Sequence, residues 1–290
     1  ASVSLTRNGE EIFIRKTEGA ETSSIEFSTG FVMERPIFCG AENTVLQTAC
    51  DNLKNLKASG FAADLVQTEE EKARYGLDHG VKVVLTAAAD TSSVMLSSGA
   101  KNPYYGLSNP DGSPYMITST YLLGDVSEGF RYVMYDDSPV VYQVPSSAFD
   151  FADSDLYQFC QRLVNLKALS DLSALTLSFD GKNYVFQIEH GEENALTVTH
   201  DFSPVDSEAF RNFYVDLVSL THTGIGQKPE GEPLLSVTYT GTDGSIDLLE
   251  LIPYPENPRK VFISLNGRGV FVTAATQAEA LKAALLKLLS

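Results

Sequence analysis

The chain has 290 residues, of which 43% are hydrophobic and 10% aromatic, so it can fill one or two cores and is not a disordered chain. Its formal net charge of −17 repels phosphate backbones and anionic lipid headgroups, which disfavours nucleic-acid binding and electrostatic attachment to membranes. The length fits two units of roughly 150 residues, and no apolar run approaches the roughly 20 residues that span a bilayer.

The first half opens with two short strands joined by Asn8-Gly9, a dipeptide that tolerates the positive φ angles of a tight hairpin turn. An amphipathic helix is predicted over 42–58, and a short helix over 69–75 ends at Gly76. The short helix begins with a capping box made by Thr68 and Glu71. Strands follow at 81–85 and 116–122, and a further hairpin combines 130–135 with 140–144.

The second half repeats this order. A hairpin turns at Asp180-Gly181, and a helix over 206–221 begins with Asp206 as its N-cap. A strand over 237–239 and a late strand over 270–273 lead to a C-terminal helix, for which we expect Thr276 as the cap. Three further Asx-Gly turns are expected at Asp111-Gly112, Asp243-Gly244 and Asn266-Gly267, and the first and last of these are matched as the late turns of the two halves.

The repeated order predicts an α+β fold made of a duplicated unit, in which an antiparallel β-sheet carries one main helix on a face. We place the first repeat, with an extra short helix and a bridging hairpin, at 1–145, and the second repeat at 146–290. A single mixed sheet whose elements resemble each other is the alternative. The unmatched segments, 61–80 and 130–144, are where a local function is expected.

Motifs for chemistry are absent from the sequence. The four histidines show no metal-ligand spacing, and no Gly-x-Ser-x-Gly nucleophile motif occurs. Asp150, Asp153 and Asp155 lack the glycine and the late glutamate of a calcium loop, so we interpret this segment as a loop with Asp caps. We therefore predict no catalytic, cofactor-binding or metal-binding residues and no cofactor.

The three cysteines make neither a paired framework nor a Cys-x-x-Cys motif, so the sequence supports no structural disulfide network and no zinc cluster. Cys50 falls on the apolar face of the first helix. We expect it to be buried as a small hydrophobic side chain.

Seven of the thirteen tyrosines lie between residues 104 and 142. Tyrosine combines an apolar ring with a polar hydroxyl, which suits a recognition surface. The alternative is that tyrosine simply favours strands, which are abundant in this part of the chain. Tyr121 belongs to the cluster, and the candidate recognition surface consists of Tyr104, Tyr105, Tyr115, Tyr132, Tyr135 and Tyr142.

Three stretches, NTVLQTACDNLKNLKA, EEKARYGLD and VKVVLTAAAD, resemble the domain of unknown function 4340 family. The local signature is Tyr75, Gly76, Leu77 and Asp78, and this chain continues with His79-Gly80 where the family usually has a proline. The resemblance covers about 40–285 and supplies no catalytic residues.

The resemblance implies a bacterial envelope protein, lipoprotein-like, that is extracytoplasmic and anchored to the membrane only through an N-terminal segment absent from this chain. The start at Ala1, without an initiator methionine, fits a mature or truncated form. The implied partner is a protein of the envelope, such as a component of an ABC-type transporter.

The leading functional hypothesis is a non-enzymatic, extracytoplasmic binding or accessory module associated with an ABC-type transport system. A hydrolase-type enzyme with a site between the two repeats is the first alternative, because ligand sites favour domain interfaces. A purely structural spacer is the second. The sequence names neither the ligand nor the partner.

Overall fold

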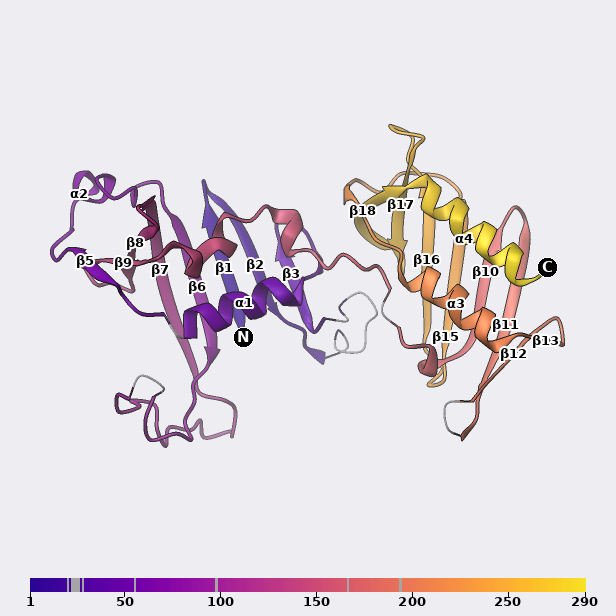
Figure 1. Ribbon diagram of the computed structural model, residues 1–290, viewed down its shortest axis with the longest axis horizontal. Coiled ribbons are helices and arrows are strands. Elements are labelled where there is room, and N and C mark those ends of the chain that lie inside the picture. Colours follow the sequence, from indigo (N-terminus) through magenta and orange to yellow (C-terminus); the bar gives the residue numbers. More distant parts are fainter. Residues whose placement is uncertain are drawn as a thin grey trace. The chain divides into compact units, whose positions relative to one another are not determined.

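A computed structural model describes residues 1–19, 21, 27, 29–54, 56–96, 99–165, 167–192 and 195–290 (Figure 1). Its contacts divide the chain into two compact units. The first consists of Ala1–Glu18 and Thr29–Cys160, and the second contains Gln161–Ser290. Residues 146–160, which the sequence-based boundary assigned to the second repeat, therefore pack with the first unit.

The first unit is built on a nine-stranded antiparallel sheet of order β4-β3-β2-β1-β6-β7-β8-β9-β5. Its strands are β1 (Ser2–Arg7), β2 (Glu10–Lys16), β3 (Phe31–Arg35), β4 (Cys39–Gly40), β5 (Gly60–Ala63), β6 (Val81–Ala88), β7 (Met116–Ser127), β8 (Phe130–Tyr135) and β9 (Val141–Pro145). Its helices are α1 (Asn43–Lys54), α2 (Glu69–Ala73) and the 3-10 helices η3 (Ser146–Asp153) and η4 (Leu156–Phe159). Helix α1 runs across one face of the sheet (Figure 1).

The second unit has the same sheet with the order β13-β12-β11-β10-β15-β16-β17-β18-β14. Its strands are β10 (Leu172–Phe179), β11 (Lys182–His190), β12 (Leu196–His200), β13 (Ser203–Val205), β14 (Gly224–Ile225), β15 (Leu235–Gly241), β16 (Ile246–Pro253), β17 (Lys260–Leu265) and β18 (Arg268–Ala274). Its helices are η5 (Leu169–Asp171), α3 (Ser207–Val218) and α4 (Ala275–Leu288). Helices α3 and α4 pack side by side across one face (Figure 1).

The two sheets are copies of one topology, which confirms the predicted duplication. Each strand of the first sheet has a counterpart at the same place in the second, and α1 and α3 both have 12 residues. The strand registers fix which residues correspond. Val83 lies opposite Tyr121 in the first sheet as Val237 lies opposite Leu249 in the second.

Two predictions about the unmatched parts were wrong. The hairpin over 130–144 does not bridge the repeats, because its strands β8 and β9 belong to the first sheet and correspond to β17 and β18. Asp111-Gly112 is not a hairpin turn but part of the long connection 89–115 between β6 and β7. Its counterpart is the tight turn at Asp243-Gly244. The 89–115 connection is therefore a large unmatched segment, which the predicted match between Asp111-Gly112 and Asn266-Gly267 had hidden.

Helix ends follow the capping rules at two places and depart from them at a third. Thr68 and Glu71 form the predicted capping box, and the Asp206 carboxylate accepts a hydrogen bond from the Ala209 N–H. Helix α4 begins two residues earlier than expected: its N-cap is Ala274, without a side-chain cap, and Thr276 lies inside the helix.

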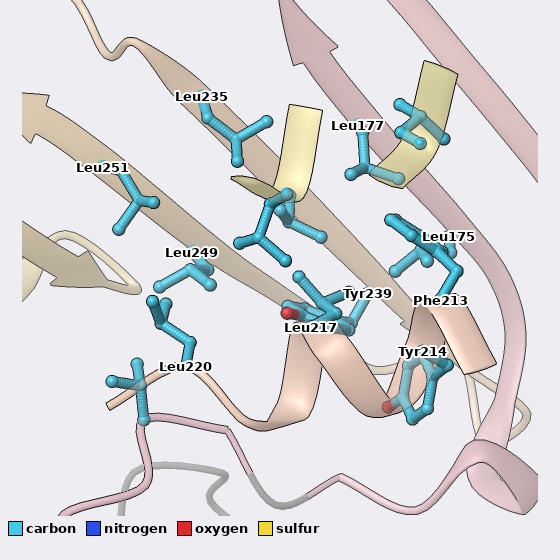
Figure 2. Packing of buried hydrophobic residues seen from close by; sticks show 14 of the residues in the cluster. Leu175, Leu177, Phe213, Tyr214, Leu217, Leu220, Leu235, Tyr239, Leu249 and Leu251 are labelled. Carbon is cyan, nitrogen blue, oxygen red and sulfur yellow. The ribbon is translucent and has the colours of Figure 1, made fainter. Parts of the chain in front are cut away.

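The core of the second unit lies between the sheet and its two helices (Figure 2). Phe213 and Leu217 of α3 recur at a spacing of four, so both face the sheet, where they meet Leu175 and Tyr239. In the first unit α1 presents Leu46, Ala49 and Leu53 in the same manner. Cys50, predicted to be buried, is exposed because it lies beside that apolar stripe.

Candidate functional site

A cavity of about 310 Å³ lies in the first unit beside the end of α1. The residue that α1 contributes to it is Leu53, and β7 contributes Tyr121. The remaining lining comes from β8, β9 and the chain just after α1. Among the side chains that the structure describes, the lining consists of Leu53, Leu56, Ala58, Tyr121, Val133, Tyr135, Tyr142 and Val144.

The sheet register brings these side chains to one face. Residues two apart on a strand point to the same side, so Val133 with Tyr135 on β8 and Tyr142 with Val144 on β9 both face the cavity. Tyr121 lies directly opposite Tyr135, and Val133 lies opposite Tyr142. Three neighbouring strands therefore form an aromatic and aliphatic floor.

The aromatic rings of the cavity are packed against further rings. Tyr121 lies 5.2 Å from Tyr135 and 5.5 Å from Phe149, measured between ring centroids, and the second contact is edge to face. Tyr142 lies 5.4 Å from Phe61, which is 72% exposed. Phe149 of η3 thus packs against the Tyr121 ring, while Phe61 is exposed to solvent beside Tyr142.

The environments of Tyr121 and Tyr135 raise the pKa values of both phenols, which favours the neutral, hydrogen-bonding form. Burial raises the pKa of Tyr121 to about 12. The hydroxyl of Tyr135 lies 3.3 Å from the Ser119 hydroxyl, and this hydrogen bond lowers the Tyr135 pKa. Burial and the Asp136 carboxylate outweigh it, so the Tyr135 pKa lies above its ordinary value.

The six tyrosines of the candidate recognition surface lie in three places. Tyr135 and Tyr142 line the cavity. Tyr132 points to the opposite face of the sheet, where its ring meets Tyr75 at 5.1 Å. The other three belong to the 89–115 connection, where the rings of Tyr104 and Tyr115 are 6.2 Å apart and Tyr105 is exposed.

Sequence reasoning missed the aliphatic half of the cavity and left Tyr121 out of the surface. The signal for Tyr121 was its alternation with Ser119 on one strand, which places both on the α1 face. Leu53 lies within the amphipathic helix predicted over 42–58. Nothing in the sequence showed that the apolar face of this helix stops covering the sheet near Leu53.

The same eight positions are filled in the second unit. Their counterparts, taken from the strand registers and from the equal spacing of α1 and α3, are Leu217, Leu220, His222, Leu249, Ile263, Leu265, Phe271 and Thr273. All are buried except Phe271, which is half-buried. Five of them join Leu281 and Leu285 of α4 in one hydrophobic cluster, and Figure 2 shows Leu217, Leu220 and Leu249 within it.

Two side chains close this region in the second unit. The His222 ring lies flat on Phe271, with the centroids 3.7 Å apart and an interplanar angle of 4°. Its Nε2–H donates to the Gln161 carbonyl at 2.5 Å. On the neighbouring helix, Gln277 Nε2 donates to Thr273 Oγ1 at 2.7 Å.

Alanine stands at both corresponding positions of the first unit. Ala58 corresponds to His222, and Ala148, the third residue of η3, corresponds to Gln277, the third residue of α4. Ala58 is exposed and, since its side chain has no ring, it cannot stack on Tyr142 as His222 stacks on Phe271. The cavity therefore lies where the second copy carries two larger polar side chains.

The histidines and acidic residues do not converge on this cavity. His190, His200 and His222 each donate a ring N–H to a backbone carbonyl, and exposed His79 lies 2.7 Å from the Asp78 carboxylate. Within the described parts of the chain, no three His, Cys, Asp or Glu side chains gather as metal ligands would.

The Asp150–Asp155 segment is more ordered than the loop we expected. Residues 146–153 form η3, and the Asp153 carboxylate accepts a hydrogen bond from the Arg131 guanidinium. Asp155 occupies the N-cap position of η4 without a side-chain hydrogen bond.

Among the helices that the structure describes, none is both long and apolar enough to cross a bilayer.

These features define a duplicated α+β protein in which the first copy carries an aromatic cavity on the sheet. In the second copy the corresponding sheet face is filled, and a separate pocket of about 270 Å³ lies between α3 and α4, lined in part by Leu220 and Gln277. The chain belongs to the domain of unknown function family DUF4340, whose sequence profile matches residues 32–236. That match includes every residue of the cavity and extends to β15 in the second unit. No curated protein matches the chain.

Proposed function

We propose that this protein is a non-enzymatic binding module and that the cavity of the first unit holds an aromatic group of its partner. The main observation behind this proposal is that Ala58 and Ala148 occupy the positions that correspond to His222 and Gln277 of the second unit. In the second unit an imidazole ring covers Phe271. The matching aromatic floor of the first unit has no such cover from Ala58, so a ring supplied by a partner fits that position.

The chemistry of the lining favours a planar, uncharged or weakly polar group. None of the eight lining side chains carries a charge, and a cavity of about 310 Å³ is at the small end of ligand pockets. A ring stacked on Tyr142 gains about 0.5–1.5 kcal/mol beyond its buried area. The Tyr135 hydroxyl, at the side of the cavity, can hydrogen-bond to a polar atom of the ligand.

The same lining argues for binding over catalysis. A hydrolase needs a nucleophile and a base within hydrogen-bond reach of each other. The cavity offers the phenols of three tyrosines, and the pKa values of Tyr121 and Tyr135 lie above the ordinary range, which makes both poor bases at neutral pH.

The partner in this proposal is a protein of the bacterial cell envelope, with a component of an ABC-type transporter as the first candidate. Family resemblance supports the extracytoplasmic, membrane-anchored location. The net charge of −17 supports a protein partner over a direct contact with anionic lipid.

Methyl-detected NMR of the full chain tests the cavity directly, with 4-methylphenol and imidazole as probes. We expect the methyl groups of Leu53, Val133 and Val144 to shift on titration with 4-methylphenol. Leu217 and Ile263, at corresponding positions in the closed second unit, provide the internal control and should not shift. Equal shifts in both units, or none in the first, would contradict the proposed site.

Pull-down from native envelopes with the full-length, anchored protein tests the function. Phe61→Ala removes the exposed ring beside the cavity, and Ile225→Ala is the matched control because Ile225 occupies the corresponding position on β14. A membrane protein recovered with the wild type and the control, but at least five-fold depleted with Phe61→Ala, supports the proposal. Equal recovery by both variants would contradict binding at the cavity, and recovery of no membrane protein with the wild type would favour a spacer role.

A further inference from the structure

Two buried cysteines lie against each other in the first unit. Cys39 belongs to β4, Cys160 follows η4 as the last residue of the unit, and their sulfur atoms are 3.9 Å apart. They are 6% and 0% exposed, and both are free thiols. The third cysteine, Cys50, is exposed and belongs to α1.

The backbone holds the two segments together without help from the sulfurs. Ala41 and Cys160 form an antiparallel bridge, and the Glu42 N–H donates to the Phe159 carbonyl at 2.8 Å. A disulfide needs the sulfurs at about 2.05 Å, so closure requires them to approach by about 2 Å. The strand contact that brings the two segments together is already formed at this sulfur separation of 3.9 Å.

We propose that Cys39 and Cys160 are a disulfide-forming pair that closes while the chain folds in the presence of a disulfide-bearing oxidant such as glutathione disulfide. One cysteine thiolate attacks the S–S bond of the oxidant, and the first oxidant sulfur leaves as a thiol. The thiolate of the second cysteine then attacks the first cysteine's sulfur in the mixed disulfide, which forms the Cys39–Cys160 bond and releases the second half of the oxidant as a thiol. Two protons and two electrons pass from the cysteines to the oxidant.

Burial explains why closure belongs to folding and not to the folded state. The hydrogen bond with Cys160 and the burial of the thiol both raise the pKa of Cys39, so little thiolate exists in the folded protein. The Cys160 thiol also donates to the Leu156 carbonyl at 3.5 Å and is fully covered. An oxidant therefore reaches the pair readily only before the core has formed.

The disulfide would join the end of the first unit to its edge strand. It would close a loop on the order of 100 residues, a length for which the stabilising effect of a cross-link is large. The second unit has no equivalent, because Ser203 occupies the position that corresponds to Cys39. The pair is independent of the cavity and of any ligand.

The test uses the full chain, reduced and unfolded, then refolded with glutathione disulfide. Non-reducing peptide mapping by mass spectrometry should find Cys39 linked to Cys160 with the loss of two hydrogens, and one thiol, Cys50, should react with a maleimide. The folded, reduced protein should oxidise at least ten-fold more slowly. Cys50→Ser should form the same link, and Cys39→Ala should not.

Thermal unfolding gives a second readout. The oxidised first unit should unfold roughly 5–15 °C above the reduced one, and Cys39→Ala should show no difference between the two conditions. Three reactive thiols after oxidative refolding, glutathione retained on Cys39 or Cys160, or a lower unfolding temperature in the oxidised form would each overturn the proposal.

Discussion

The first and second units share one sheet topology, yet they differ in what covers the sheet at the end of the first main helix. In the second unit, His222 and Gln277 complete a buried cluster over β16, β17 and β18. In the first unit, alanines at the corresponding positions leave a cavity over β7, β8 and β9. Above the same sheet topology, the two units thus differ in two side chains and in the element that follows the β8–β9 and β17–β18 hairpins, which is the eight-residue η3 in the first unit and the 14-residue α4 in the second.

The largest effect is expected from removing a buried leucine in the closed copy. Leu217→Ala should destabilise the second unit by about 2–5 kcal/mol, because Leu217 is fully buried in a packed cluster. Leu53→Ala at the corresponding position should cost about 2 kcal/mol, since Leu53 already borders empty space. Urea unfolding of the full chain measures both, and equal losses would show that the cavity is closed in solution.

His222→Ala should cost about 1–3 kcal/mol and create in the second unit the cavity that the first unit has. The variant loses the stacked ring and leaves the buried Gln161 carbonyl without its donor. If the comparison holds, 4-methylphenol will now shift the methyl resonances of Leu220 and Ile263. Unchanged resonances at saturating probe would argue that other side chains fill the space.

His222 also makes the stability of the second unit depend on pH. Burial lowers its pKa below the ordinary 6.5, so the unfolded chain binds a proton here more readily than the folded chain. The stabilising effect is complete above pH 6.5 and declines as the pH falls from 6.5 toward the folded pKa. His222→Phe, which keeps a ring on Phe271 without a titrating group, should flatten this decline in unfolding experiments between pH 7 and 5.

The converse substitution, Ala58→His, should fill the cavity of the first unit. We expect a gain of up to about 1 kcal/mol from stacking on Tyr142, and a loss of at least ten-fold in affinity for 4-methylphenol. Ala58→Ser is the matched control, as it adds a small polar atom without a ring. Similar affinities of the two variants for 4-methylphenol would show that the probe binds outside the cavity.

The smallest change in stability is expected from shortening the 89–115 connection. The Ala89 N–H donates to the Tyr115 carbonyl, and the Gly241 N–H donates to the Ser245 carbonyl in the same way. Replacing residues 90–114 by Thr-Asp-Gly, the sequence of the turn at 242–244, therefore preserves the strand register. Because loop-closure entropy changes slowly with length, unfolding should move by less than about 1 kcal/mol. Loss of the cooperative transition would show that this connection supports the sheet.

The fold was largely readable from local chemistry. Four of the five Asx-Gly turns lie in tight hairpins, where Asn8, Asp180 and Asn266 have positive φ angles that few other residues accept. The spacing of apolar residues at three and four positions predicted which faces of α1 and α3 are buried. The fifth turn, at Asp111, was misleading because a turn dipeptide specifies a local bend and carries no information on which strands it joins.

The cavity could not be predicted in the same way. Its tyrosines were visible as a cluster, but alternation sends Tyr132 to one face and Tyr135 to the other only once the register is known. The decisive residues, Ala58 and Ala148, carry no signal by themselves. Their meaning depends on a long-range alignment with His222 and Gln277, which requires the paired strands and not the sequence.

The edges of both sheets have a consequence for how a partner can approach. The outermost strands are short: β4 and β14 have two residues each, β13 has three and contains Pro204, and β5 has four. Such short strands, among the described residues, present few free backbone groups along which another chain could extend either sheet. Under the proposed function, a binding peptide would therefore be selected by its side chains and not by its backbone.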